Sequence, residues 1–311
     1  MAVTASGCVT VHGEREIVPA ATKAEAARAL KDFTKAYNAA EAEADPAKDA
    51  KYLTGPFGAI NQADLKVRAE RKKNGSEGPA PTPLKFDDTK FTIPKQAGWP
   101  RWFVADSGSN KDNNDQFRWV LVFTRGGMDL PWEASYVAFL KPGQVPKFKK
   151  DADGLAEPVA LNDSKLTVPP KNLSKEYASY LKDGGETFEE GTHTSGWREK
   201  REREAERLGL VTQYIDEPQN SGDFAPVGLR TENGGALVFF STRHFEKRTA
   251  AEGLNLRIPA DVRALMRGDA KGAVTLESVA GQAALVPPKG GTNSLVQVLN
   301  RVQGLTGAKG E

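Results

Sequence analysis

The sequence predicts an α+β protein with two tandem domains, each of them helices packed on a curved antiparallel sheet. Its 311 residues exceed the roughly 100–200 residues of one typical domain. Its composition, 39% hydrophobic and 27% charged, is typical of a globular protein. In each half, segments with helical periodicity precede segments with strand periodicity. We expect a truncated lipoprotein signal and tether over residues 1–21, a first domain over 22–160 and a second over 161–311.

The first half begins with a helix expected over residues 22–44. Thr22 is a suitable N-cap and Glu25 occupies the third helical position, which together form a capping box. One apolar stripe at helical spacing consists of Ala26, Leu30, Phe33 and Tyr37. Asp45-Pro46 ends the helix. Further helical segments are expected over 47–53 and 59–73, with a glycine- and proline-rich break at 55–58.

Strand signals follow in the first half. The expected strands are 84–93, 102–106, 117–125 and 133–140. Residues 117–125 are apolar on both faces, which is typical of a central strand. The proline-rich segment 141–170 is expected to be a linker, with a closing strand near 155–161.

The second half repeats this order. Helices are expected over 174–182 and 197–208, with a helical turn near 260–266. The expected strands are 210–215, 225–231, 236–243, 273–278, 283–286 and 295–303. Asn233-Gly234 between apolar runs is a strong hairpin signal. Similar strand ends at 122–125 and 240–243 suggest a tandem duplication.

Bulk properties exclude several classes of function. A net charge of +2 gives no basic excess of the kind that nucleic-acid binding needs, so we expect no nucleic-acid partner. The longest apolar runs are about a quarter of the roughly 20 residues of a membrane-spanning helix. The chain has 1 Cys and 3 His, and the histidines are not at ligand spacing. We therefore expect no disulfide, metal or cofactor.

The single cysteine lies near the start, in Ala5-Ser6-Gly7-Cys8. This segment resembles the lipobox of bacterial lipoproteins, and the resemblance implies a diacylglycerol on the Cys8 thiol and a body on the extracytoplasmic face of the cell membrane. A signal peptide needs an apolar region of about 7–15 residues. Only Met1 to Gly7 precede Cys8, so we expect the signal to be truncated here.

The chain as a whole, with its Ala-Ser-Gly-Cys start and its segment 233–241, is similar to uncharacterised lipoproteins of high-GC actinobacteria. Its order of helices and strands resembles the cone-shaped nuclear-transport-factor-two-like superfamily. That superfamily includes isomerases, cyclases and non-catalytic binding modules, so the fold does not decide the function. The first hypothesis is a membrane-anchored, non-enzymatic module that binds an unknown envelope protein or small ligand. The alternative is a cone-fold isomerase or cyclase that uses Asp106, Glu133 or Tyr136.

An aromatic cluster supplies the candidate contact residues. The cluster consists of Trp99, Trp102, Phe103, Phe117, Trp119 and Trp132. The candidate contact residues are Trp99, Trp102, Trp119, Trp132 and Tyr136. Their strand spacing favours a place in the core, and the functional alternative is the lining of a pocket. Trp99 and Trp132 lie beside prolines at strand edges, where a half-exposed ring suits carbohydrate or partner contact. No Gly-x-Ser-x-Gly motif marks a catalytic nucleophile.

Overall fold

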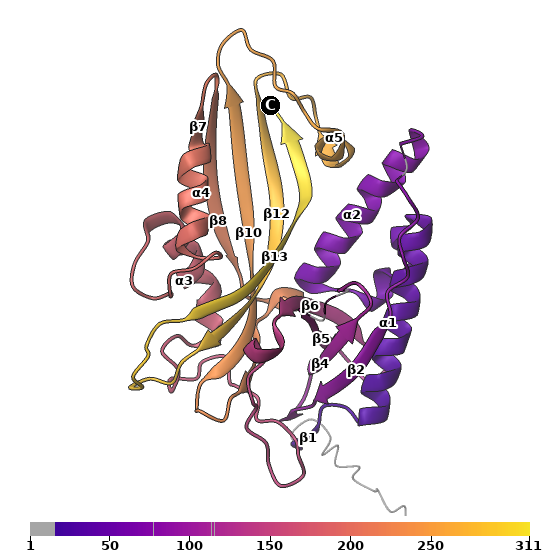
Figure 1. Ribbon diagram of the computed structural model, residues 1–311, viewed down its shortest axis with the longest axis vertical. Coiled ribbons are helices and arrows are strands. Elements are labelled where there is room, and N and C mark those ends of the chain that lie inside the picture. Colours follow the sequence, from indigo (N-terminus) through magenta and orange to yellow (C-terminus); the bar gives the residue numbers. More distant parts are fainter. Residues whose placement is uncertain (1–15, 77, 113, 115) are drawn as a thin grey trace, which may run out of the picture.

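The computed structural model describes residues 16–76, 78–112, 114 and 116–311 and has an α+β fold in four layers. Helix α1, a four-stranded sheet, a seven-stranded sheet and the pair α3 and α4 follow one another from right to left in Figure 1. No helix in these ranges has both the length and the apolar character that crossing a membrane requires.

Helix α1 (Lys23–Glu43) confirms the predicted capping box. The Thr22 amide donates to the Glu25 carboxylate (2.7 Å), and the Glu25 amide donates to the Thr22 hydroxyl (3.1 Å). Two 3₁₀ turns, η1 (Pro46–Lys48) and η2 (Ala50–Tyr52), lead to α2 (Gly55–Lys73). The expected break at 55–58 was wrong, because α2 already begins at Gly55. A proline is tolerated in the first helical turn, since amide groups there have no hydrogen-bond partner within the helix.

The four-stranded sheet confirms the predicted meander. Its strands, in the spatial order β2-β4-β5-β6, are β2 (Phe86–Thr92), β4 (Arg101–Ser109), β5 (Arg118–Arg125) and β6 (Glu133–Leu140). The expected tether ends earlier than residue 21. β1 (Val18–Pro19) pairs with β3 (Lys95–Gln96), and Ala20 and Ala21 are buried, so the packed body already includes Val18.

The linker contains one 3₁₀ turn, η3 (Pro142–Gln144). The closing strand expected at 155–161 is absent from this described segment. Ala156 and Pro158 form isolated bridges instead. Pro158 has no amide hydrogen, so it cannot donate a ladder hydrogen bond.

The second half has two helices followed by long strands. Its helical elements are α3 (Pro170–Asp183), α4 (Ser195–Ala205), η4 (Gly222–Phe224) and α5 (Ala260–Leu265). Its strands are β7 (Glu206–Arg207), β8 (Leu210–Gln219), β9 (Val227–Arg230), β10 (Ala236–Ala250), β11 (Met266–Arg267), β12 (Ala273–Val286) and β13 (Gln297–Gly310). The sheet order is β11-β13-β12-β10-β8-β7, with β9 also paired to β10.

Two of these strands are longer than predicted. The expected strands 273–278 and 283–286 are one strand, β12, and β10 continues well beyond residue 243. Gly281 lies between the two expected strands, and a strand glycine occurs where another element approaches closely. Here a Cβ on Gly281 would lie 3.4 Å from Pro56 of α2.

The two sheets share one apolar core. Side chains from both halves form it, among them Trp102, Val104, Val122, Tyr136, Leu229, Leu237, Phe239 and Ala283. The first half contains two helices and then a four-stranded antiparallel meander, and the second contains α3 and α4 and then the antiparallel run β8-β10-β12-β13, with β9 and α5 inserted. The similar strand ends that suggested a duplication lie on β5 and β10. These strands are not equivalent, because β5 is the third strand of the first meander and β10 is the second strand of the run in the second half. That local similarity therefore does not support a duplication, and the domain boundary at 160 stays a prediction.

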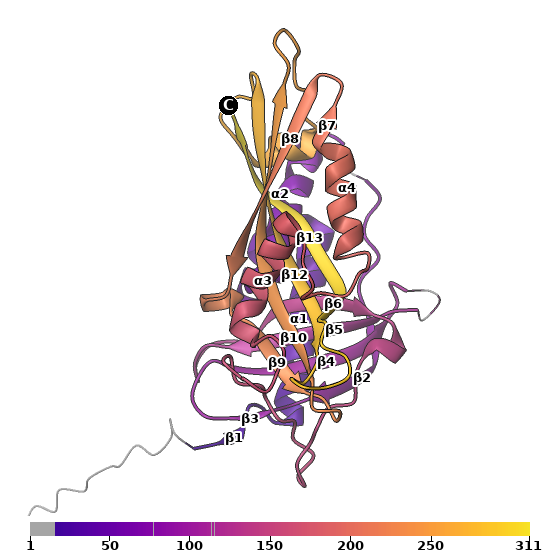
Figure 2. The same cartoon turned by 90° about the vertical axis from the view of Figure 1, so that its left-hand side faces the viewer.

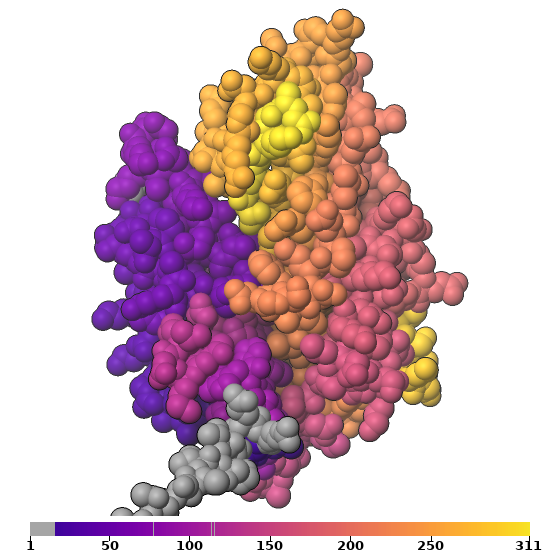
Figure 3. Space-filling model, turned by 180° about the vertical axis from the view of Figure 1, so that it is seen from behind, coloured from indigo at the N-terminus to yellow at the C-terminus, as the bar shows by residue number. Residues whose placement is uncertain are grey.

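Helix α2 connects the two halves by close packing against the second sheet. From behind, the N-terminal helices and the second half lie side by side (Figure 3). At their junction a Cβ on Gly304 of β13 would come within 2.5 Å of the Ile60 side chain of α2. The absence of a side chain at Gly304 thus sets the distance between the helix and the sheet.

We expect Gly304→Ala to lower the free energy of unfolding by about 1–3 kcal/mol, because the added methyl overpacks this contact. Urea unfolding would measure the loss. Gly272→Ala is the matched control, since a Cβ there meets nothing within 4 Å. Equal stabilities of the two variants would contradict this role for Gly304.

Candidate binding site

The structure divides the predicted aromatic residues between the two faces of the first sheet. Trp102 and Tyr136 face the second sheet, and both are buried. The Tyr136 hydroxyl donates to the carbonyls of Phe224 and Ala225, each at 3.0 Å. Trp119 and Trp132 pack on the opposite face, in the core that α1 covers. These residues therefore do not line one common pocket.

The residues considered for catalysis do not converge. Asp106 forms an ion pair with Arg118. In the strand register, Asp106 lies four residues along β4 from the position that is in line with Glu133 across β5. Burial and the charge of Asp223 raise the pKa of Glu133, and burial raises the pKa of Tyr136. With Tyr136 committed to two backbone carbonyls and Asp106 to Arg118, no shared proton-transfer site results.

Trp132 does line a cleft of about 310 Å³, between the start of α1 and the turn that joins β5 to β6. The other lining residues are Glu25, Arg28, Ala29, Asp32, Tyr52, Arg125, Leu130 and Pro131. Two guanidinium groups, two side-chain carboxylates beside them and two aromatic rings thus share one small concavity. Such a mixture suits a ligand with both an apolar face and polar groups.

Arg125 organises this cleft. Its guanidinium donates to the carbonyls of Leu130 (2.7 Å) and Met128, which fixes the turn. The same group lies 5.8 Å from the ring centroids of both Trp99 and Trp132, within cation–π range. Arg125 thus brings together the two tryptophans that the sequence marked as half-exposed.

The charges of the cleft favour binding over proton transfer. Hydrogen bonds from Thr22 lower the pKa of Glu25, and the charges of Arg125 and Arg28 act in the same direction. Glu25 is therefore ionised at neutral pH and is a poor general acid. A fixed, ionised carboxylate between guanidinium groups can instead orient a polar or zwitterionic ligand.

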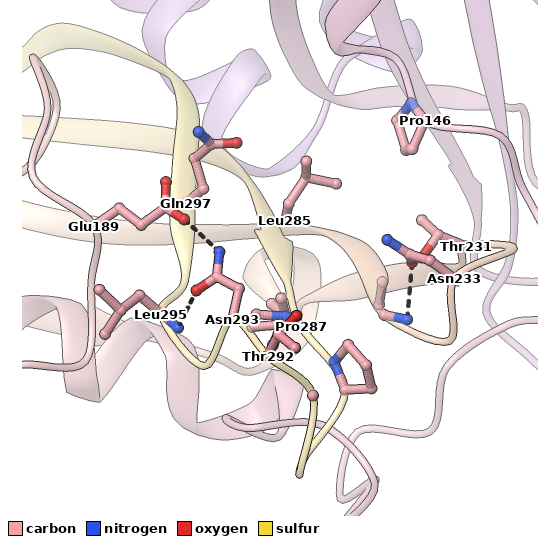
Figure 4. Close-up of a pocket in the computed structure, with 15 residues that line it drawn as sticks. Pro146, Glu189, Thr231, Asn233, Leu285, Pro287, Thr292, Asn293, Leu295 and Gln297 are labelled. Carbon is pink, nitrogen blue, oxygen red and sulfur yellow. Dashed lines mark hydrogen bonds between the residues drawn. The ribbon is translucent and has the colours of Figure 1, made fainter.

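A second cleft, of about 370 Å³, lies where the β12–β13 turn ends the second sheet, and Figure 4 shows its lining residues. Pro146, the turn after β9 and the turn between β12 and β13 surround it. Asn293 fixes one wall, where its amide donates to Glu189 (2.6 Å) and its oxygen accepts from the Leu295 amide (3.0 Å). No aromatic ring lines this cleft, and Glu189 is its single charged lining residue. Sequence reasoning missed it, because only the Asn233-Gly234 turn gave a local signal.

A buried polar network links α4 to the second sheet, and it too was missed. His244 of β10 lies directly opposite Asp216 of β8 in the strand register. Arg201 of α4 donates to both Asp216 oxygens, at 2.6 and 2.9 Å. His244 Nδ1 faces the Asp216 carboxylate and Nε2 lies 2.8 Å from the Thr242 hydroxyl. No local signal pairs these residues, because β9 lies between β8 and β10 in the sequence.

This network has the order of groups of an Asp–His–hydroxyl relay, but it is enclosed. The side chains of Asp216 and His244 are each 4% exposed and Thr242 is fully buried. Burial and nearby arginines lower the pKa of His244 to about 4 despite the bond to Asp216. Burial would raise the pKa of Asp216, but bonds from His244 and Arg201 lower it to about 2. A neutral imidazole without substrate access indicates a structural role.

His244→Gln tests this role through pH. The folded imidazole has a lower pKa than the unfolded one, about 4 against 6.5, so its stabilising contribution is complete above pH 6.5 and is lost as pH falls towards 4. We expect the stability gap between wild type and variant to shrink over that window in urea unfolding. Burial raises the pKa of Asp49 to about 6, so its contribution to stability changes with pH in the opposite direction. Asp49 is present in both proteins, so its contribution cancels in the difference. A constant gap would contradict a buried neutral His244.

Cys8 lies outside the described residues, so the structure does not place it. Within the described ranges, no group of three or more His, Cys, Asp or Glu side chains could hold a metal ion.

Comparisons with known proteins give the chain its relatives. It is 54% identical over 312 residues to an uncharacterized lipoprotein of Streptomyces coelicolor, across 100% of this chain and 92% of the relative. An uncharacterized lipoprotein of Streptomyces avermitilis is 53% identical with the same coverage. A further uncharacterized lipoprotein of S. coelicolor is 25% identical over 289 residues, across 89% of this chain and 80% of that protein.

These names confirm the resemblance to uncharacterised actinobacterial lipoproteins. No solved structure matches the chain. The family described as a domain of unknown function (DUF8094) matches residues 17–310, which is nearly the whole packed body. The chain therefore belongs to the DUF8094 family, whose name assigns no activity.

Proposed function

We propose that this protein is an envelope lipoprotein, anchored through an acylated Cys8 on the extracytoplasmic face of the membrane, whose body is a non-enzymatic binding module. The lipoprotein names of relatives at 54% and 53% identity support the anchor. The Trp132 cleft carries the binding role, because it combines aromatic rings with charged groups of both signs. The ligand class that fits is a carbohydrate-rich polymer of the cell wall or another polar envelope component.

The position of the cleft agrees with such a role. The packed chain enters at β1, at the lower end of the molecule (Figure 2), and α1 follows directly. Glu25, Arg28 and Asp32 of the cleft belong to the first turns of that helix. The interval from Cys8 to Val18 can span at most about 35 Å. An acylated Cys8 would therefore keep the Trp132 cleft near the membrane surface and the inner layers of the wall.

The finer fold assignment is also a proposal. The repeated order of two helices and a four-stranded meander supports two tandem units of the nuclear-transport-factor-two-like type, divided near residue 160. The shared core between the sheets means that the two units fold against each other. The alternative isomerase or cyclase function gains no support from Asp106, Glu133 and Tyr136, because they are separated and none of them lines either cleft described above.

The anchor is tested by Cys8→Ala in the native gene with its upstream codons intact. We expect the wild-type protein in the membrane fraction and in the detergent phase, with an acylated N-terminal peptide in the mass spectrum. The variant should leave the membrane, since one thioether-linked diacylglycerol supplies the hydrophobic attachment. Wild-type protein that carries an unmodified Cys8 in the cytosol would refute the anchor.

The Trp132 cleft is tested by binding to purified peptidoglycan. We expect Arg28→Gln and Trp132→Phe each to weaken binding about tenfold, the usual effect of removing one well-placed contact. Trp132→Phe keeps an aromatic ring against Phe103 and so preserves the packing. Phe117→Ala, an exposed aromatic residue between β4 and β5, is the matched control. Binding that is equal in all four proteins would remove the cleft from the proposal.

A further inference from the structure

An apolar groove of about 310 Å³ lies at the end of the molecule opposite β1, where β7, β8 and α5 are found (Figure 1). Eight Leu, Ile and Val side chains line it, together with two arginines. Neither an acidic nor an aromatic side chain is part of this lining. The groove is thus chemically unlike the two clefts at the other end.

The strand register explains the floor of the groove. Arg248 of β10 lies between Thr212 of β8 and Val274 of β12, so these side chains share one face of the sheet. The same face carries Asp216 and His244 further down, where α4 covers it. Beyond the end of α4 at Ala205, the segment 251–259 and α5 cover this face, and they leave the groove between them.

Packing at this end of the sheet is incomplete. The local core contains four buried apolar residues, Val262, Val274, Leu276 and Ala308. At the rim, Leu208 is fully exposed and Leu254 is 53% exposed. Burying a leucine side chain is worth about 1.5–3 kcal/mol. Single exposed leucines are common, but two beside an apolar groove extend its surface and favour a ligand that covers them.

The charge of the groove is positive. Arg248 donates to Glu246 at 2.6 Å, so its charge is balanced. Arg257 is exposed and has no ion pair among the described residues. An anionic group beside Arg257 would complement this unbalanced guanidinium.

We propose that this groove binds a single acyl chain with an anionic head group, with the chain between β12 and α5 and the head group at Arg257. The lining of the groove favours an alkyl chain, because it consists mainly of Leu, Ile and Val side chains and includes no acidic or aromatic one. This inference is independent of the proposed anchor and of the Trp132 cleft.

Calorimetry on the full chain with Cys8→Ala keeps any covalently attached lipid out of the experiment. The probes are alkyl carboxylates and alkyl phosphates from octyl to tetradecyl, each below its micellar concentration, with dodecanol as the uncharged control. We expect each added pair of methylenes to strengthen binding about fifteenfold until the groove is full, and then a plateau. Carboxylates that bind better than phosphates would identify a fatty acid, and the reverse order would identify a lysophospholipid-like ligand.

Two variants locate the site. Leu256→Trp should fill the groove and weaken every ligand at least tenfold. Arg257→Gln should weaken the charged ligands about tenfold and leave dodecanol unchanged. The controls are Leu161→Trp, an exposed leucine between β6 and α3, and Arg203→Gln, an exposed arginine of α4.

Circular dichroism would show whether Leu256→Trp folds. If it does not, Arg257→Gln still tests the proposal, because Arg257 is exposed and its substitution should not disturb the fold. Affinity that does not rise with chain length would overturn the proposal. Variants that bind as tightly as the two controls would overturn it as well.

Discussion

The apolar contact between the two sheets is the constraint on which the rest of the structure depends. The first sheet is buried on both faces, by α1 on one side and by the second sheet on the other. Trp102, Val104 and Val122 have no other apolar partner layer, so the first half cannot complete its core without β10 and β12. Burying one large apolar side chain stabilises the fold by about 1.5–3 kcal/mol, whereas an exposed ion pair contributes about 0–1 kcal/mol.

This contact also explains which parts of the fold were predictable. Local signals sufficed for α1, where Thr22 and Glu25 form the cap, and for β6, whose bounds match the prediction. Local signals failed where contacts with residues far away in the sequence decide the structure. Strand β12 was predicted as two strands, and the glycine between them, Gly281, is explained by the close approach of Pro56 of α2, more than 200 residues away in the sequence. The strands β10 and β12 continue through polar residues because each has partners on both sides.

The candidate sites follow the same rule. Trp99 and Trp132 were identified as half-exposed aromatic residues from their neighbouring prolines, and the structure joins them through Arg125. The partners of Trp132 on α1 could not be inferred, since no local pattern relates a helix start to a turn a hundred residues later. The pairing of His244 with Asp216 was hidden for a different reason: β8 and β10 are neighbours in the sheet, but β9 lies between them in the sequence.

The length of β10 has a mechanical consequence. Its 15 residues span about 50 Å, and hydrogen bonds to β12 accompany it along almost its whole length. A continuous ladder of this kind bends little, so the strand acts as a stiff spacer between the polar clefts at one end and the apolar groove at the other. The second cleft, beside Ala236, and the apolar groove, beside Ala250, are therefore held at opposite ends of this strand, and a small molecule bound at one end cannot reach the other.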